Sequence, residues 1–192
     1  PPSPPPPPPT PPPPPLPPVT DPGLRIRWIS PYTDLVDPDP EIRFASPLGD
    51  QVEATGITFY SSKDFTIATA IPYNLALRFD GYINIPTAGD WTFTLESYDG
   101  SKLWLGPSGT GGTPVVDNGG RHTRRERNGT VALGVGLVKA VATYYVRSCG
   151  NCPYVVLSWQ CASCGVSKEA IPPGSYKFVV PPPPPSPPPS PP

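Results

Sequence analysis

The stretch from residue 77 to 106 reads LRFDGYINIPTAGDWTFTLESYDGSKLWLG, and its alternation decides the fold. Apolar side chains occupy every second position across 77–85 and again across 91–95. A period of two is typical of β-strands that bury one face. The Pro-Thr-Ala-Gly-Asp segment between them favours a turn, so the sequence predicts a half-buried antiparallel hairpin. Asp99-Gly100 predicts a second turn, which leads into a third strand at Leu103–Leu105.

Further segments of the chain have the same strand character. They are Leu24–Ile29, Ile57–Tyr60, Thr130–Val146 (as two strands) and Tyr154–Trp159. The sequence therefore predicts an all-β domain built from antiparallel strands. The side chains expected in its core are Trp28, Phe79, Ile83, Trp91, Phe93, Leu95, Trp104, Leu157 and Trp159.

The order of these motifs resembles the PA-fourteen domain, the β-barrel module named after the anthrax protective antigen. The matching parts are Ile85-Pro86, Gly89, Trp91–Phe93, Asp99–Ser101, Leu103–Leu105, Val116–Gly119, Thr143–Tyr145, Leu157–Trp159 and Ile171-Pro172. The resemblance covers the chain from Gly23 to Phe178. It implies an antiparallel β-sandwich or barrel of the PA-fourteen type.

Proline is concentrated at both ends of this 192-residue chain, which contains 37 prolines. Residues 1–18 and 181–192 consist almost entirely of proline, with a few Ser, Thr and Leu. The proline ring fixes φ and removes the amide donor, so both ends are predicted to form polyproline II rods. Residues 19–180 have ordinary composition and are long enough to bury the core of one β domain.

The Ser-Pro-Pro-Pro pattern of the ends resembles the extensins and related hydroxyproline-rich glycoproteins of plant and green-algal cell walls. The resemblance implies hydroxylated prolines that carry O-glycans, whereas a plain spacer is the alternative. The O-glycosylation positions that it implies are Ser3, Pro4, Pro5, Pro6, Pro7, Pro8, Thr10, Pro11, Pro12, Pro13, Pro182, Pro183, Pro184, Ser186, Pro187, Pro188 and Ser190.

Charge and composition make several function classes improbable. The formal net charge of −1, without segregation of sign, gives no indication of a nucleic-acid partner. No apolar run approaches the ~20 residues that span a membrane. The sequence shows no nucleophile elbow and no phosphate loop. It also shows no feature that would place two carboxylates on opposite sides of a cleft. We therefore expect the chain not to be an enzyme.

Two Cys-x-x-Cys pairs, at 149/152 and 161/164, lie on either side of the strand predicted at 154–159. A straight strand holds the pairs up to roughly 30 Å apart, whereas disulfide partners need Cα atoms within about 7 Å. An extracellular setting also favours disulfides. We therefore expect local bridges, Cys149–Cys152 and Cys161–Cys164. Nested bridges (149–164 and 152–161), a four-thiolate zinc site and intermolecular pairing are the alternatives.

Some PA-fourteen domains, notably in yeast adhesins, bind sugars through Ca²⁺ held by two adjacent aspartates. The corresponding pair here is Tyr98-Asp99, so only one carboxylate carries over. Asp117 and Asn118 could add the hard oxygen ligands that calcium prefers. The resemblance thus implies a reduced calcium and carbohydrate site at Asp99, Asp117 and Asn118, with simple turns as the alternative. No cofactor is required.

The segment Arg121–Arg127 holds five basic or potentially basic side chains in seven residues. A solvated loop is the simpler interpretation, and a contact for anionic sugars such as uronates is the alternative. His122 is the only histidine, and we expect it to have a structural role. Asn128-Gly129-Thr130, directly after this segment, is the only N-glycosylation acceptor triplet, and we expect Asn128 to be exposed.

These features together predict an extracellular structural glycoprotein of a fibre, cell wall or surface coat. Glycosylated polyproline rods would be joined by a β domain that docks on its neighbours. The expected partners are covalent O-glycans, other copies of this chain or other matrix glycoproteins, and wall polysaccharides. The alternative is a carbohydrate-binding lectin or adhesin module, with or without calcium, carried on proline-rich stalks.

Overall fold

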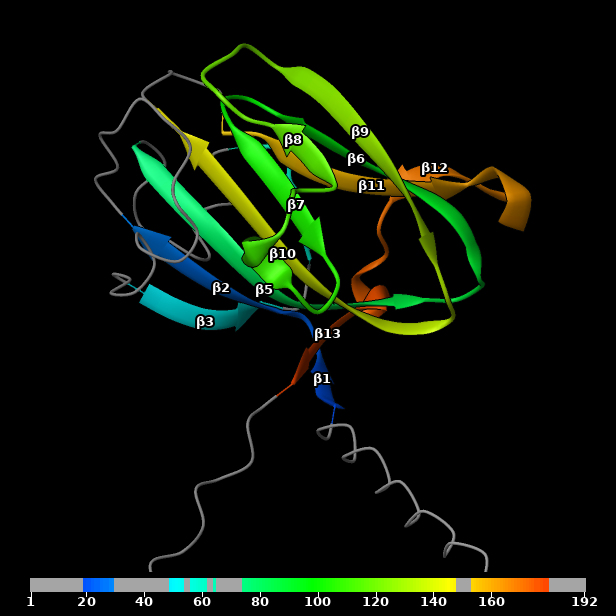
Figure 1. The fold of residues 1–192 in the computed structure, drawn as a ribbon. Coiled ribbons are helices and arrows are strands. Elements are labelled where there is room, and N and C mark those ends of the chain that lie inside the picture. The colour runs from blue at the N-terminus through cyan, green and yellow to red at the C-terminus, as the bar shows by residue number, and fades with distance from the viewer. Residues whose placement is uncertain are drawn as a thin grey trace, which may run out of the picture.

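The computed structural model describes residues 19–29, 49–53, 56–61, 64, 74–147 and 153–179. The strands in these ranges form two antiparallel sheets that pack face to face (Figure 1). This arrangement confirms the predicted all-β fold. The described residues contain no helix long and apolar enough to cross a membrane. The predicted O-glycosylation positions, Cys149 and Cys152 lie outside the described ranges.

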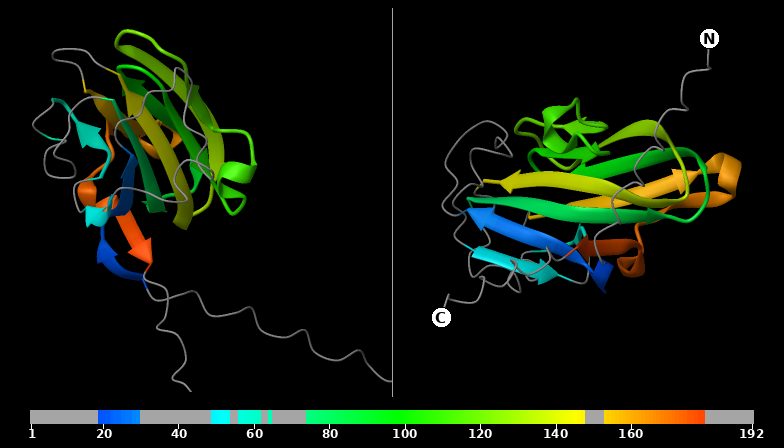
Figure 2. Two further views of the ribbon diagram at one scale, coloured as in Figure 1. Left: turned by 90° about the vertical axis from the view of Figure 1, so that its left-hand side faces the viewer. Right: turned by 60° about the horizontal axis from the view of Figure 1, so that its bottom comes forward.

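The larger sheet has eight strands, with β5 and β10 at its centre. These two strands pair along their whole length, from Gly136 opposite Ile85 to Val146 opposite Leu75. Figure 2 shows β5 and β10 side by side, with β2 and β3 beyond β5. The strands of this sheet are β1 (Val19–Pro22), β2 (Leu24–Ile29), β3 (Gly49–Glu53), β5 (Leu75–Ile85), β7 (Ser101–Leu105), β8 (Val116–Asn118), β10 (Gly136–Val146) and β13 (Tyr176–Val179).

The smaller sheet has five strands, in the order β12-β11-β6-β9, with β4 paired to β11. Its central pair is β6 with β11, joined from Ser97 opposite Val155 to Thr92 opposite Gln160. The strands are β4 (Thr58–Phe59), β6 (Gly89–Ser97), β9 (Arg125–Leu133), β11 (Val155–Cys161) and β12 (Val166–Ala170). Three short 3₁₀ helices complete the described chain: η1 (Gly109–Gly111), η2 (Ala162–Cys164) and η3 (Pro173–Ser175).

The predicted hairpin between 77–85 and 91–95 is wrong, because these strands belong to different sheets. β5 pairs with β10, β2 and β13, whereas β6 pairs with β11 and β9. The third strand, β7, returns to the larger sheet. Alternation identifies the face of a strand that is buried, but it carries no information about which strand lies beside it. β5 and β6, although consecutive in the chain, therefore lie in opposite sheets instead of pairing with each other.

The apolar faces of the two sheets meet in one hydrophobic core. Seven of the nine predicted core residues belong to it: Phe79, Ile83, Trp91, Phe93, Leu95, Leu157 and Trp159. Trp28 is only partly buried and packs against the margin of this core. Trp104 is buried at 6% exposure on the opposite face of β7 from Leu103, where its indole nitrogen donates to the carbonyl of Gly112 at 3.0 Å. The alternation of β7 assigns Leu103, not Trp104, to the inter-sheet side.

A crossover end of the sandwich is formed where two connections pass between the sheets. Residues 86–88 join β5 to β6, and residues 134–135 join β9 to β10. The Cys161–Cys164 disulfide packs against the first connection, since a Cβ on Gly89 would lie 2.6 Å from the Cys164 sulfur. Glycine at this position lets the disulfide-bonded turn approach the backbone closely.

The first and last described strands lie next to each other. β1 pairs antiparallel with β13, and Val19 lies opposite Val179 (Figure 1). The two proline-rich segments are therefore joined to the domain at neighbouring points of one sheet edge. The division of the chain at residues 18 and 181 stays a prediction.

Candidate functional site

Three polar segments gather at the other end of the sandwich, which we call the loop end. They are the turn 97–100 at the end of β6, the segment 119–124 between β8 and β9, and Tyr154 directly before β11. Backbone hydrogen bonds join them: Asp99 N–H donates to the His122 carbonyl at 3.0 Å, and Tyr98 N–H donates to the Tyr154 carbonyl at 3.0 Å. The candidate site residues therefore rest on a connected framework.

Asp99 is buried at 8% exposure in the turn of the loop end. Its φ is 55°, in the left-handed region that Asp tolerates better than most residues. One carboxylate oxygen accepts the N–H of Arg147 at 2.9 Å, and its carbonyl accepts the Ser97 hydroxyl at 2.8 Å. Asp99 thus fixes the turn and the end of β10.

Asn118, at the end of β8, is fully buried beside this turn. Its amide nitrogen donates to the Ser97 hydroxyl at 3.0 Å and to the Arg125 carbonyl at 3.1 Å. Its amide oxygen accepts Nε of Arg125 at 2.9 Å. Ser97 therefore links Asn118 to Asp99, and the structure brings these two predicted residues into one network.

Asp117 is not part of that network. β8 alternates, so Asp117 points to the opposite face from Asn118 and its side chain is 54% exposed. Its carboxylate pairs with Lys102 at 3.3 Å and accepts the N–H of Gly119 at 2.9 Å. Within the described residues, no group of three or more His, Cys, Asp or Glu side chains could hold a metal ion.

The donor set fits calcium poorly. The Asn118 oxygen already accepts a guanidinium hydrogen, and a cation placed there would face the positive charge of Arg125. Asp117 is directed elsewhere, which leaves Asp99 as the single carboxylate in the turn. Calcium binding at Asp99, Asp117 and Asn118 stays a prediction without further support.

His122 holds the segment 119–124 in place, as expected from the sequence. One ring nitrogen lies 2.9 Å from the Asn118 carbonyl and the other lies 2.7 Å from the Thr123 carbonyl.

A second cluster at the loop end was not predicted from the sequence. The Tyr154 ring lies between the Arg124 guanidinium, 3.9 Å from its centroid, and the Tyr60 ring, at 5.9 Å between centroids. Glu96 accepts Nε of Arg124 at 2.6 Å and the Tyr154 hydroxyl at 3.0 Å. We call Tyr60, Glu96, Arg124 and Tyr154 the tyrosine–arginine cluster. Its members come from four separate segments, so no spacing in the sequence indicates it.

Electrostatics follow from these contacts. The hydrogen bond from Arg124 holds the pKa of Glu96 below its usual value. Burial, and then the hydrogen bond to Glu96, raise the pKa of Tyr154 to about 12. Tyr60 is 61% exposed, and Asp64 fixes the local backbone by accepting the N–H groups of Tyr60 at 2.8 Å and Ser61 at 2.9 Å. The cluster therefore offers a fixed, exposed aromatic ring beside a charged pair.

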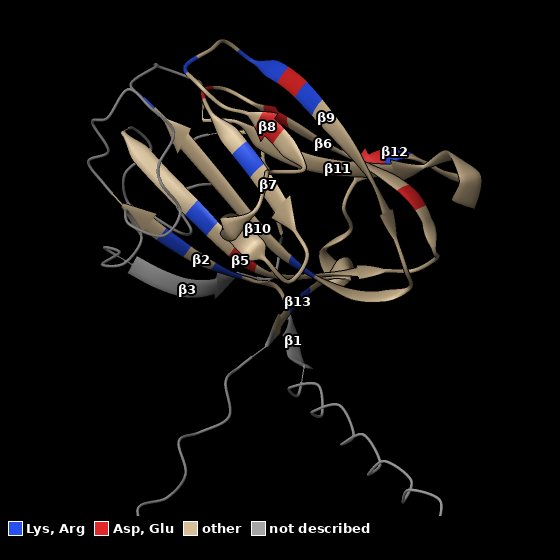
Figure 3. Ribbon diagram, viewed as in Figure 1, with Lys and Arg blue, Asp and Glu red and all other residues tan. Residues whose placement is uncertain are grey.

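The basic segment 121–127 is not a uniform positive loop. Arg124 pairs with Glu96, and Arg125 donates to Asn118 and to the Gly119 carbonyl, the latter at 2.9 Å. Residues from Arg125 onward lie in β9, where basic and acidic side chains alternate (Figure 3). Two of its arginines thus have structural partners.

The cysteine pairing was predicted correctly where it is described. Cys161 and Cys164 form a disulfide with Cα atoms 5.1 Å apart, around η2. The nested bridges and the four-thiolate zinc site are wrong, since each needs the sulfurs of Cys161 and Cys164 for other bonds. The Cys149–Cys152 bridge lies outside the described residues.

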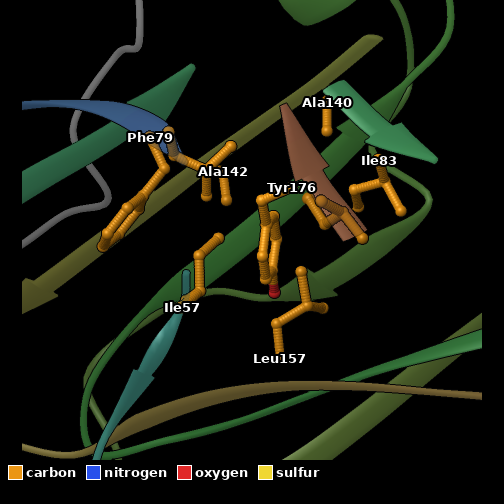
Figure 4. A pocket seen from close by; sticks show the side chains of 9 residues that line it. Ile57, Phe79, Ile83, Ala140, Ala142, Leu157 and Tyr176 are labelled. Carbon is orange, nitrogen blue, oxygen red and sulfur yellow. The ribbon is translucent and has the colours of Figure 1, made fainter. Parts of the chain in front are cut away.

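Neither of two pockets lined by described residues is an enclosed ligand chamber. A space between the sheets is lined by apolar side chains around Tyr176 (Figure 4), but it has no room for a water-sized sphere. Gly56 lies against this tyrosine, since a Cβ there would overlap the ring. An open groove of about 420 Å³ lies beside η2 and is lined by Gln160, Ala162, Gly165, Val166, Ser167 and Lys168.

Comparison with known proteins identifies the fold family. A family model described as the PA14 domain matches residues 21–171. No curated protein matches the chain.

Solved structures with this fold are distant in sequence. An anti-sigma factor domain-containing protein is 20% identical with a TM-score of 0.64, over 84% of this chain and 49% of that one, so this chain spans about half of it. The PA14 sugar-binding domain from an RTX adhesin is 12% identical with a TM-score of 0.59. The match covers 81% of this chain and 98% of that domain. A third structure is the epithelial adhesin 6 A domain from Candida glabrata in complex with Galβ1-3GlcNAc. It is 16% identical with a TM-score of 0.60, and the match covers 84% of this chain and 89% of that one. These likenesses show the fold, and with the match over residues 21–171 they place the chain in the PA14 domain family.

Proposed function

We propose that this chain is an extracellular carbohydrate-binding module of the adhesin type, carried on proline-rich segments. Two solved structures of similar fold are named as a PA14 sugar-binding domain and as an epithelial adhesin domain in complex with Galβ1-3GlcNAc. This supports the carbohydrate-binding alternative over the structural glycoprotein that the sequence first indicated. We place the binding surface at the loop end and assign it no catalytic residue.

The observation that carries this proposal is the tyrosine–arginine cluster. An exposed ring such as Tyr60 can pack against the C–H face of a pyranose, and burial of apolar surface favours that contact. Arg124 and Glu96 supply planar donors and acceptors that can engage neighbouring hydroxyls. Because Glu96 and Tyr154 already hold the Arg124 guanidinium, little side-chain entropy is lost on binding.

The charge of this surface favours a neutral sugar. Arg124 pairs with Glu96, and Lys168 pairs with Glu126 at 2.6 Å. Because Arg124 is already paired with Glu96, the tyrosine–arginine cluster itself offers no unpaired cation to a uronate carboxylate. We therefore expect retention on neutral glycans, unaffected by calcium removal because the residues around Asp99 fit calcium poorly.

The proposal is tested by binding of the secreted protein to an array of neutral and acidic glycans, with and without a calcium chelator. Tyr60→Ala should lower binding about tenfold, since the lost ring contact is worth on the order of 1.4 kcal/mol. Val135→Ala, at the crossover end, is the matched control because Val135 is 70% exposed and far from Tyr60 in the fold.

Two outcomes would change the proposal. Binding that disappears with the chelator and with Asp99→Asn, but survives Tyr60→Ala, would restore the calcium site as the binding surface. If the folded protein binds no glycan with or without the chelator, the structural role becomes the favoured function.

That structural role keeps one supporting observation, the pairing of β1 with β13. Both proline-rich segments start from one sheet edge, so the domain can project sideways from a chain of such segments. In this second proposal the prolines and serines of the ends carry O-glycans, and the partners are further copies, matrix glycoproteins or wall polysaccharides.

A further inference from the structure

The outer face of the five-stranded sheet is covered by small polar side chains in register across three strands. One row contains Asn128 of β9, Thr94 of β6 and Ser158 of β11. The next row contains Thr130, Thr92 and Gln160, and the two threonine hydroxyls share a hydrogen bond of 2.8 Å. The outward side chains of these two rows are therefore polar, with Asn128 and Thr130 the exposed ones.

Asn128 lies at the margin of this face. β9 pairs only with β6 among the described strands, so it is an edge strand of nine residues. Long edge strands can pair with other chains unless something covers them. Asn128 is exposed, whereas its neighbour in the row, Thr94, is 3% exposed.

The backbone at Gly129 fixes which way Asn128 points. A Cβ on Gly129 would overlap the carbonyl of Val115, which lies against the inner side of β9. Since side chains alternate along a strand, Asn128 and Thr130 point away from that contact, toward the outer face. The acceptor triplet Asn128-Gly129-Thr130 is thus presented with its amide and its hydroxyl on the same side.

We propose that Asn128 carries an N-linked glycan whose first sugars lie over the row of Thr94 and Ser158 and cover the edge of β9. The amide nitrogen of Asn128 attacks the anomeric carbon of a lipid-diphosphate-linked oligosaccharide during secretion. The nitrogen–carbon bond forms, the carbon–oxygen bond to the diphosphate breaks, and the amide proton leaves with the lipid diphosphate. This site is independent of carbohydrate binding at the loop end.

The Lys168–Glu126 pair gives the glycan a defined neighbour. Lys168 of β12 reaches Glu126 of β9, so the pair joins the two outer strands of the row β12-β11-β6-β9 across this face. Glu126 is two residues from Asn128, on the same side of β9. A glycan lying on the face would therefore shield Lys168, whereas one extending into solvent would leave it reactive.

Occupancy is tested by peptide mass after secretion from eukaryotic cells. Trypsin cleaves after Lys139 and yields a proline-free peptide that begins at or just before Asn128, so glycans on the proline-rich ends do not interfere. We expect a discrete N-glycan on this peptide in the wild type and in Thr130→Ser, which keeps the hydroxyl. Asn128→Gln and Thr130→Ala should lose it. A bare wild-type peptide from cells that glycosylate a reference glycoprotein would overturn the proposal.

Placement over the face is tested by acylation of lysines in the folded protein. Lys168 should react severalfold more slowly in the glycosylated wild type than in Asn128→Gln. Lys139, exposed on β10 of the other sheet, is the internal control and should react equally in both. Equal rates at Lys168 would show that the glycan leaves this face uncovered, and that part of the proposal would fall.

Discussion

The two ends of the sandwich are held together by different means. At the loop end, side chains from separate strands form a dense polar network around Asn118 and a second cluster around Tyr154. The crossover end is held instead by two short connections, by the close approach of the backbone at Gly89 and by the Cys161–Cys164 disulfide. The network around Asn118 is buried, but Tyr60 and Arg124 of the second cluster are exposed and can therefore contact a ligand, whereas a disulfide offers no strong hydrogen-bonding group. This difference is why we place binding at the loop end.

Asn118→Ala should have the largest effect on stability. The change removes an amide that satisfies Ser97 and Arg125 in a fully buried place, and unsatisfied buried groups cost on the order of 3 kcal/mol together. Urea unfolding of the secreted domain measures this loss. The adjacent Asp117→Ala is the control, because an exposed ion pair contributes at most about 1 kcal/mol. Equal losses from the two variants would remove the special role of the buried network.

Loss of the disulfide at the crossover end should cost less. The Cys161→Ala/Cys164→Ala variant frees a loop with a sequence separation of only 3, for which chain entropy predicts about 2 kcal/mol. Thermal unfolding of the variant should show a lower Tm with binding unchanged. Reduced glycan binding in this variant would contradict the separation of the two ends.

Alkaline pH should weaken the loop end through Tyr154. Its pKa is about 12 in the folded protein, against 10.0 when exposed. A raised folded pKa means that the unfolded state loses its proton first, so stability falls as pH rises from 10 toward 12. The contribution is up to about 1.4 kcal/mol per pH unit. Tyr154→Phe should show a correspondingly shallower decline in unfolding free energy, and an unchanged slope would contradict this assignment.

Acid should produce the smallest effect, through Glu96. Its folded pKa lies below the ordinary 4.5, so its contribution is complete above pH 4.5 and is lost as pH falls through the lower folded value. Because the pair is partly exposed, the change in stability should be slight. Glycan binding is the more sensitive measurement and should decline below pH 4.5 in the wild type. Glu96→Gln, which cannot ionise, should bind with little dependence on pH in that range.

The sequence predicted the faces of the strands better than their partners. The alternation around Phe79, Ile83 and Trp91 correctly assigned these side chains to the core, because burial of one face is a local property. The pairing of β5 with β10, some 60 residues later in the chain, depends on the whole topology. No local pattern in either strand indicates it. The crossover of β5 and β6 was therefore mistaken for a hairpin.

The candidate site was predictable only in part. Asn118 lies two residues after buried Val116 in an alternating strand, and that phase was a usable sign that its amide is buried. The contact of Arg124 with Glu96 and Tyr154 joins β6, the residue before β11 and the segment before β9, and no motif links them. Arg124 instead stood within a run of basic residues, which suggested a solvated loop. Its contacts with Glu96 and Tyr154 are seen only in the folded structure.

The pairing of β1 with β13 sets how the domain would respond to a pull on its two ends. Force applied through residues 18 and 180 would act at Val19 and Val179, the open end of an antiparallel pair. Such a pair separates like a zipper, with its hydrogen bonds breaking one after another, instead of shearing all at once. Tension would therefore separate β1 from β13 at low load and lengthen the chain, whereas Tyr176 of β13 would stay buried in the core. β5, β10 and the loop end would stay folded, with the proposed binding surface shielded from the strain.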